Sequence, residues 1–210
     1  MRQVVILAAG VDSRAYRLSW PHGTVVYELD RPQVLEFKRE VLAEHAATPT
    51  AQRHELAVDL REDWSTALQD NGFDPDEPSA WLVEGLLIYL SAAAQVHLFE
   101  TIDSVAALGS FVGVEEMALI PPDAYVAMTA PQDDPKAAEA ADWARLIYNE
   151  HRIPAMQWFD EHGWNTTAAV LSDYLASLGK ATTGRQPQNG LSPSAISLVT
   201  AGPKTAPSAH

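Results

Sequence analysis

The feature that most constrains this chain is an alternation of short apolar runs with longer segments whose apolar residues recur at helical spacing. The short runs are rich in β-branched and aromatic residues, which is typical of buried strands. They lie at residues 3–8, 24–28, 80–83 and 110–115, and a further strand, which alternates less cleanly, is expected at 54–58. Helical patterns occupy residues 32–45, 64–71 and 92–108. Because parallel strands need a long crossover connection, this alternation predicts an α/β fold with a parallel sheet and helices on both faces.

The pattern changes after Met117, where prolines become frequent and strand signals disappear. We expect residues 120–165 to form an insertion over one end of the sheet, with a helix at 136–150. Its four large aromatic residues are interpreted as core contacts, with pocket walls as the alternative. They are Trp143, Trp158, Phe159 and Trp164.

The last third of the chain completes the sheet. Strands are predicted at residues 164–170 and 194–200, with a helix at 172–178 between them. Residues 203–210 are polar and are expected to form a frayed tail. The length suits one domain, so we assign residues 1–210 to a single unit.

The charge balance excludes two classes of partner. The 210 residues contain 28 Asp and Glu against 14 Lys and Arg, a formal net charge of −14. Nucleic-acid backbones and anionic membrane surfaces both favour Lys and Arg, so neither is expected as a partner. No apolar run approaches the roughly 18 residues of a membrane span. The apolar run at residues 4–9 is also too short, and too soon followed by charges, for a secretion signal.

Cysteine and histidine usage narrows the chemistry. The chain has no cysteine, which excludes disulfides, thiolate metal sites and cysteine nucleophiles, and fits a reducing, cytoplasmic location. Its seven histidines show no metal-ligand spacing, so no metal site is expected. The sequence also lacks a GxSxG nucleophile motif and a phosphate-binding P-loop.

Acidic residues and glycines follow the predicted strands at the points where they end. In open parallel sheets, ligands bind outside these carboxyl ends. Gly10 allows a tight turn and a close backbone approach to a ligand. Asp30 stands twenty residues later, the interval at which an acid binds ribose hydroxyls in nucleotide-binding folds. Because side chains alternate along a strand, Glu28 would share one face of the second strand with Asp30. We expect Glu28 to lie among the acids at this edge of the sheet.

The third and fourth strands add further candidates. Asp59 could accept a hydrogen bond from an adenine amino group, with Leu60 packing on the ring, and Glu84 follows the central apolar strand. Each acid also has a structural interpretation. Asp30 could cap the helix that follows it, Asp59 could cap the helix at Trp64 or stay solvated, and Glu84 could be a structural acid. Arg14 and Arg17 could be surface charges or could neutralise these acids.

Residues 4–18, VVILAAGVDSRAYRL, closely resemble the signature of S-adenosylmethionine-dependent methyltransferases of the leucine carboxyl methyltransferase-like family, in its mycobacterial branch. The resemblance continues through residues 26–32, 58–61 and 81–90. It implies a Rossmann-like seven-stranded sheet, mostly parallel with an antiparallel last strand, and S-adenosyl-L-methionine as cofactor.

The resemblance also assigns site residues. Gly10 would lie against the methionine part of the cofactor, and Asp30 would bind its ribose. Asp59 and Leu60 would hold the adenine, and Glu84 would line the pocket near the transferable methyl group. No catalytic residue is assigned, and Tyr89 and Glu84 are pocket candidates only.

Two departures from the family pattern stand out. Ala8 replaces the first glycine of the signature. Family members generally also carry helices before the first strand, which cap the pocket and supply an arginine to the cofactor's carboxylate, so we expect this chain to be shortened on that side.

We therefore expect an S-adenosylmethionine-dependent methyltransferase, acting on an oxygen of a small molecule or a carboxylate acceptor. A cofactor-binding or inactive shortened homologue is the alternative. An NAD-dependent oxidoreductase is less consistent with the sequence, because the GxGxxG motif is missing and the Asp59-Leu60 pair is present. The acceptor and the oligomeric state stay open.

Overall fold

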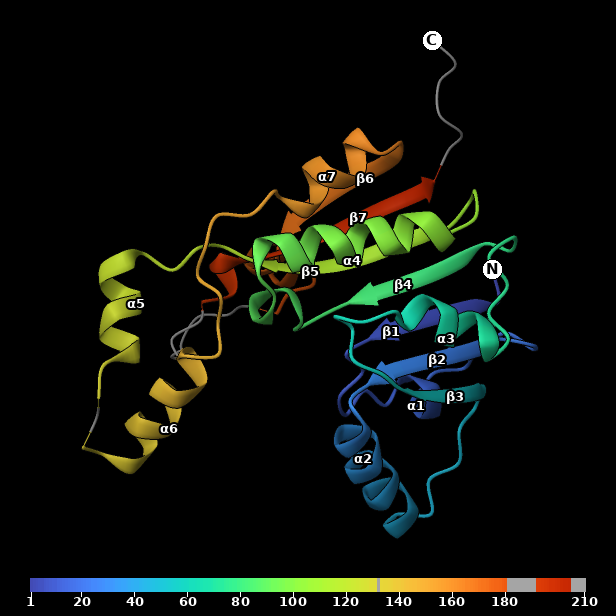
Figure 1. Cartoon of the computed structure of the whole chain (residues 1–210), viewed down its shortest axis with the longest axis horizontal. Coiled ribbons are helices and arrows are strands. Elements are labelled where there is room, and N and C mark those ends of the chain that lie inside the picture. The colour runs from blue at the N-terminus through green and yellow to red at the C-terminus, as the bar shows by residue number, and fades with distance from the viewer. Residues whose placement is uncertain (132, 181–191, 205–210) are drawn as a thin grey trace.

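The structure is a computed structural model, and it describes residues 1–131, 133–180 and 192–204. Seven strands form one sheet in the order β3-β2-β1-β4-β5-β7-β6 (Figure 1). The strands are β1 (Gln3–Leu7), β2 (Val25–Asp30), β3 (Gln52–Ala57), β4 (Ser79–Val83), β5 (Phe111–Met117), β6 (Trp164–Val170) and β7 (Ile196–Lys204).

The direction of the strands agrees with the sequence-based expectation. Strands β1 to β5 pair in parallel, whereas β7 runs antiparallel to both β5 and β6. The reversal of strand order between β1 and β4 puts a switch point in the middle of the sheet, which is where open α/β sheets bind ligands.

Helices connect the strands. They are α1 (Arg14–Arg17), α2 (Pro32–Glu44), α3 (Trp64–Asp70), α4 (Ala92–Val105), α5 (Pro122–Thr129), α6 (Pro135–Ala144), α7 (Ala155–Glu161) and α8 (Leu171–Ser177), with short 3₁₀ turns η1 (Leu87–Tyr89) and η3 (Pro193–Ala195). Ser91 caps α4 as its sequence position predicts, accepting a hydrogen bond from the Ala94 N–H at 3.3 Å.

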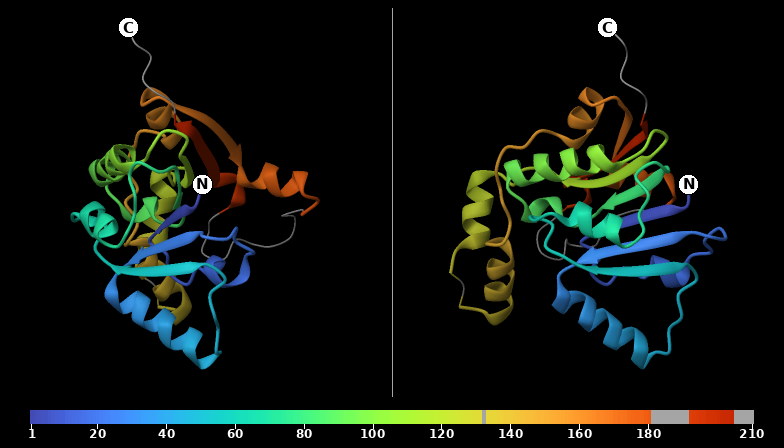
Figure 2. Two further views of the ribbon diagram at one scale, coloured as in Figure 1. Left: turned by 90° about the vertical axis from the view of Figure 1, so that its right-hand side faces the viewer. Right: turned by 45° about the vertical axis from the view of Figure 1, so that its right-hand side comes forward.

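The larger core lies on the side of the sheet covered by α3, α4 and α7. Alternate residues of the strands, such as Val5 and Trp81, face this side and are fully buried. Helix α4 contributes Phe99, which packs on Phe159 of α7 with ring centroids 4.9 Å apart. A smaller cluster on the opposite face joins β1 and β2 to Ala15 of α1. Figure 2 shows α4 and α8 on opposite sides of the sheet.

The aromatic residues near the insertion divide into two groups. Trp158, Phe159 and Trp164 are buried in the larger core, which confirms their interpretation as core contacts. Trp143 is only half-buried, and its indole N–H donates to the Tyr89 hydroxyl at 2.7 Å. It therefore links α6 to the turn after β4.

The helical hairpin of α5 and α6 extends away from the sheet (Figure 1). We call these helices and their connection the α5–α6 arm. The helix expected at 136–150 is shorter, because α6 ends at Ala144 and the chain then turns, so that the Tyr148 N–H donates to Ile88 O at 2.9 Å.

The C-terminal tail expected at 203–210 is described only in part. Its first two residues belong to the end of β7, and residues 205–210 lie outside the described residues. No helix within the described ranges is long and apolar enough to cross a membrane.

Candidate functional site

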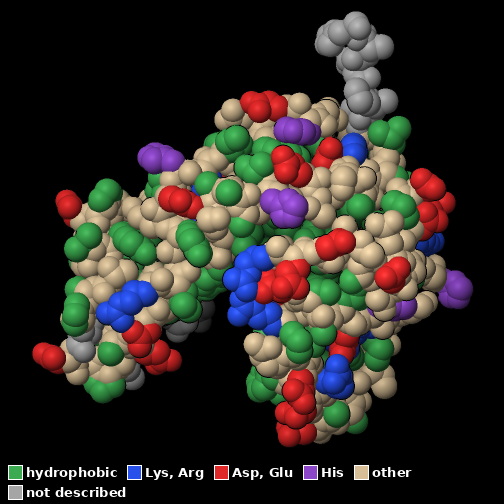
Figure 3. All heavy atoms as spheres, in the orientation of Figure 1, with side chains coloured by type: hydrophobic (Ala, Val, Ile, Leu, Met, Phe, Trp, Pro, Cys, Tyr) green, Lys and Arg blue, Asp and Glu red, His purple; other side chains and the backbone are tan. Residues whose placement is uncertain are grey.

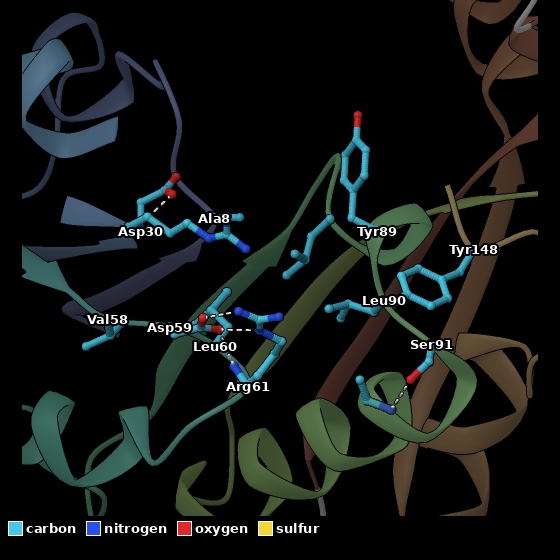
Figure 4. A pocket seen from close by; sticks show the side chains of 13 residues that line it. Ala8, Asp30, Val58, Asp59, Leu60, Arg61, Tyr89, Leu90, Ser91 and Tyr148 are labelled. Carbon is cyan, nitrogen blue, oxygen red and sulfur yellow. Dashed lines mark hydrogen bonds and ion pairs between the residues drawn. The ribbon is translucent and has the colours of Figure 1, made fainter. Parts of the chain in front are cut away.

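Two adjacent hollows open at the carboxyl ends of the parallel strands. The main cavity (Figure 4) is walled by the ends of β1, β2 and β3, by the turn after β4 and by Tyr148. The loop hollow beside it is lined by residues of β1, by the loop that follows β1 and by Glu84. Ala8 lines both hollows, so they meet at the end of β1.

The loop after β1 takes an unusual backbone path. Ala8 and Gly10 both have positive φ, +54° and +47°. Glycine adopts this conformation freely, whereas alanine is strained there by about 1–2 kcal/mol. The signature residue that Ala8 replaces is glycine, and the geometry gives the physical reason for that preference. Backbone strain at a ligand-binding turn is a common feature of functional sites.

Asp30 connects this loop to the second strand. Its Oδ2 accepts a 2.7 Å hydrogen bond from the Gly10 N–H, and its Oδ1 accepts one of 2.7 Å from the Arg31 N–H. The N-cap of α2 is Arg31, which makes no side-chain capping bond. Asp30 thus fixes the end of β2 against the β1 loop while it lines the main cavity.

Asp59 and Leu60 line the same cavity from the end of β3. The Asp59 carboxylate accepts hydrogen bonds from the Arg61 backbone N–H at 3.0 Å and from the Arg61 Nε at 2.8 Å, and a third from Nη2. These hydrogen bonds hold the pKa of Asp59 well below its usual range, so the carboxylate is ionised. The alternative that Asp59 caps the next helix is wrong, because Asp63 is the N-cap of α3.

Glu84 lies in the loop hollow and not among the residues lining the main cavity. Its carboxylate is paired with Arg14, which also contacts Asp12 at 3.3 Å. Of the two interpretations of Arg14, neutralisation of the acids is therefore confirmed. The Glu84 side chain is 43% exposed, so the cost of placing a carboxylate here is low.

Glu28 does not join the other acids, and the expectation that it would is wrong. Its side chain is fully buried on the α2 side of the sheet, where its Oε2 accepts hydrogen bonds from Lys38 Nζ at 2.6 Å and from Arg53 Nε at 2.8 Å. Glu28 and Asp30 do alternate correctly along β2. However, Glu28 lies two residues inside the strand, where α2 covers it.

Tyr89, a pocket candidate from the sequence, lines the main cavity, whereas three other charged or aromatic residues there were not predicted: Arg31, Arg61 and Tyr148. Arg31 and Arg61 could have been found by extending the strand-end rule by one or two residues. Tyr148 comes from the chain after α6, and no local sequence signal ties that segment to the cavity.

The residues of the main cavity fit an adenosine group. Two carboxylates, Asp30 and Asp59, can accept hydrogen bonds from hydroxyl and amino groups. Leu60, Leu86 and Leu90 supply apolar surface for a ring. Within the described residues, no group of three or more His, Cys, Asp or Glu side chains could hold a metal ion.

Comparison with known proteins agrees with this geometry. Residues 1–103 match the family described as leucine carboxyl methyltransferase. A Mycobacterium bovis protein named "Putative S-adenosyl-L-methionine-dependent methyltransferase" is 55% identical over 192 residues, or 90% of this chain. The chain is therefore similar to this family and to its mycobacterial proteins. A protein of the same name from Mycobacterium sp. (strain KMS) is 53% identical over 201 residues, or 96% of the chain.

The match covers only part of each relative. The chain spans 63% of the M. bovis protein and 66% of the Mycobacterium sp. protein. Solved structures support the fold. A DUF574 family protein from Streptomyces avermitilis superposes with a TM-score of 0.62 at 15% identity, over 96% of this chain and 75% of that one. An O-methyltransferase family protein from Burkholderia thailandensis gives 0.54 at 12% identity, over 95% and 50%.

Proposed function

We propose that the chain binds S-adenosyl-L-methionine across the main cavity and the loop hollow, and that it catalyses methyl transfer to an acceptor. The observation that carries this proposal is the hydrogen bond between the Gly10 N–H and Asp30, which holds the turn after β1 against the end of β2, beside the switch point between β1 and β4. The named mycobacterial relatives support the same choice of cofactor.

Each predicted site residue has a role in this proposal. Asp30 binds the ribose hydroxyls, and Asp59 accepts from the adenine amino group while Leu60 packs on the ring. Gly10 leaves the backbone open to the methionine part, and Glu84 lines the pocket near the methyl group. The acidic surroundings suit a cofactor whose sulfonium is cationic.

The cofactor supplies a methyl group that is activated by attachment to a positively charged sulfur. The protein's contribution is to orient the acceptor and to exclude water. Leu86, Leu90 and Tyr148 provide the apolar wall for that exclusion. We propose that the acceptor is an oxygen of a small molecule or of a carboxylate. A carboxylate oxygen is nucleophilic without a general base, so the proposal assigns no catalytic residue.

Two measurements test the proposal. Titration calorimetry with S-adenosyl-L-methionine should give a saturable heat, and the same experiment with NAD should give none. Absence of heat with S-adenosyl-L-methionine would rule out the proposed cofactor site.

Transfer of a labelled methyl group from the cofactor to small molecules of a cell extract then tests turnover. Labelled product is expected. Binding without any transfer would favour the alternative, a cofactor-binding protein without turnover.

A further inference from the structure

Beside the main cavity lies a groove that shares part of its lining with that cavity and whose arginines have no role in the proposed cofactor site. It has a volume of about 700 Å³ and is lined by Arg31, Arg61, Tyr89, Arg145, Leu146, Ile147 and Tyr148. We call it the arginine groove. Arg145 follows α6 in the chain, and Arg31 and Arg61 follow β2 and β3, so the groove joins the α5–α6 arm to the sheet. Figure 3 shows Lys and Arg side chains beside the recess between these two parts.

Three arginines in one groove stand out in a chain of this charge. The protein has only 14 Lys and Arg and a net charge of −14. Arg61 is paired with Asp59, and Arg145 with Asp142. Arg31 has no ion pair among the described residues, although its backbone N–H is bonded to Asp30. Arg31 is therefore the guanidinium of this groove that no carboxylate of the described residues neutralises, and it lies beside two further arginines.

The groove is held in shape by the contacts of its own residues. Arg145 donates to the Thr129 carbonyl from Nε at 3.2 Å and from Nη2 at 2.9 Å, which fixes the direction of its guanidinium. The Tyr89 ring is fixed by the indole of Trp143 at its hydroxyl. A prearranged site loses less conformational entropy when a ligand binds.

The position of the groove points to the acceptor. Arg31, Arg61, Tyr89 and Tyr148 line both the groove and the main cavity, so a ligand in the groove would lie beside the cofactor. The cofactor's adenosine has no negative charge that would require these arginines. Guanidinium groups bind carboxylates and phosphates in a bidentate manner, and tyrosine rings pack on flat apolar groups.

We propose that the arginine groove binds a negatively charged group of the methyl acceptor, a carboxylate or a phosphate, that is distinct from the atom receiving the methyl group. This inference rests on the proposed function. The acceptor is then an anionic small molecule with an apolar or aromatic part. Arg31 and Arg145 hold its charge, and Tyr89 and Tyr148 pack on its apolar part.

Three naphthalene compounds of matched shape test this inference by titration calorimetry in low salt. They are 2-naphthoate, 2-naphthyl phosphate and the neutral 2-naphthamide. We expect at least one anion to bind at least tenfold more tightly than the amide, and the stronger of the two identifies the preferred anion. Equal affinity of all three compounds would overturn the proposal.

Variants locate the binding site. Arg145→Ala and Arg31→Ala should each weaken binding of the preferred anion at least fivefold. Arg2→Ala removes an exposed arginine at the start of β1, at the opposite end of the strands, and should leave the affinity unchanged. An equal loss in all three variants would show a nonspecific charge effect and would overturn the proposal. Far-ultraviolet circular dichroism checks that each variant is folded.

A competition experiment separates this inference from the proposed function. Saturating S-adenosyl-L-methionine should leave the anion bound, because the two ligands occupy adjacent sites. Displacement of the anion by the cofactor would overturn the assignment to the acceptor while supporting the cofactor site. Anion binding by a protein that gives no heat with S-adenosyl-L-methionine would instead refute the proposed function, and with it the assignment to the acceptor.

Discussion

The Gly10 N–H and the Asp30 carboxylate are joined by a 2.7 Å hydrogen bond, although twenty residues separate them in the chain. Strands β1 and β2 are adjacent and in register, with Leu7 opposite Leu29. The turn after β1 therefore lies against the end of β2. One oxygen of Asp30 holds this turn, and the same carboxylate lines the main cavity.

Asp30→Asn tests that double role. The amide can still accept a hydrogen bond, but it loses the charge that strengthens hydrogen bonds to hydroxyl groups. Such charge-assisted bonds contribute about 1.5–3 kcal/mol, so we expect at least a tenfold loss of S-adenosyl-L-methionine affinity. Titration calorimetry measures it. Asp70→Asn, at the exposed end of α3, is the matched control and should bind normally. An unchanged affinity of Asp30→Asn would refute the ribose assignment.

Ala8→Gly should stabilise the protein. Ala8 has a φ of +54°, which is unfavourable for alanine and free for glycine. After the larger conformational entropy of glycine in the unfolded chain is subtracted, about 0.5–1 kcal/mol should remain. Urea denaturation measures the free energy of unfolding. The neighbouring Ala9 is buried and lacks a positive φ, so Ala9→Gly should lower stability instead. A loss of stability in both variants would contradict the strain at Ala8.

Glu28→Gln should strongly destabilise the fold. The Glu28 carboxylate is fully buried and is the counter-charge for Lys38 and Arg53, whose side chains are 3% and 9% exposed. Removing one partner of a buried ion pair leaves uncompensated charge and costs about 3–5 kcal/mol. Glu36→Gln on the exposed face of α2 is the control, with an expected change within about 0.5 kcal/mol. Urea denaturation at neutral pH distinguishes them, and similar values for both variants would contradict the prediction.

Ionisation of the buried Glu116 carboxyl should lower the stability of the folded state as the pH rises. Burial raises the pKa of its carboxyl, although the Ala155 N–H, which donates to Oε1 at 3.1 Å, partly opposes the rise. The pKa of this carboxyl is about 4.5 in the unfolded chain and higher in the folded protein. Its contribution to the stability of the folded state is therefore fully present below about pH 4.5 and is lost as the pH rises through the pKa of the folded protein.

Glu116→Gln removes this titration and retains an oxygen that can accept from Ala155. We expect the variant to match the wild type near pH 4 and to be more stable near pH 8. Thermal denaturation at the two pH values measures the difference. A variant that is less stable than the wild type at pH 8 would contradict the prediction.

Tyr89→Phe should loosen the α5–α6 arm. It removes the acceptor of the Trp143 indole N–H, one of the contacts that link α6 to the main body. A typical hydrogen bond contributes about 0.5–1.5 kcal/mol, so local opening should become a few-fold to about tenfold more frequent. Amide hydrogen exchange of α6 measures it. Tyr174→Phe, on exposed α8, is the control and should leave α6 exchange unchanged. Identical exchange in both variants would show that this hydrogen bond does not hold the arm.

Much of the fold was predictable because its signals are local. Strands such as β1 and β4 are short apolar runs, although β3 (QRHELA) is mostly polar, and the Pro32 and Ser91 positions mark the beginnings of α2 and α4. The sheet pairing then brings Gly10, Asp30 and Asp59 to one edge. The ion pairs of individual acidic residues were less predictable, because they depend on neighbours that are distant in the chain. Glu28 meets Lys38 and Arg53, and Glu84 meets Arg14, through packing that no strand pattern encodes.

The sequence by itself determined the alternation of strands and helices, the strand-end acids and the family resemblance, because these depend on residue type and spacing along the chain. Only the tertiary structure decided that Glu28 is buried against Lys38 and Arg53, that Glu84 lies outside the main cavity, and that Tyr148 lines it. The physical reason is that charge pairing and cavity walls depend on which side chains meet across the sheet. Hydrogen bonds such as that between Tyr148 and Ile88 connect segments sixty residues apart.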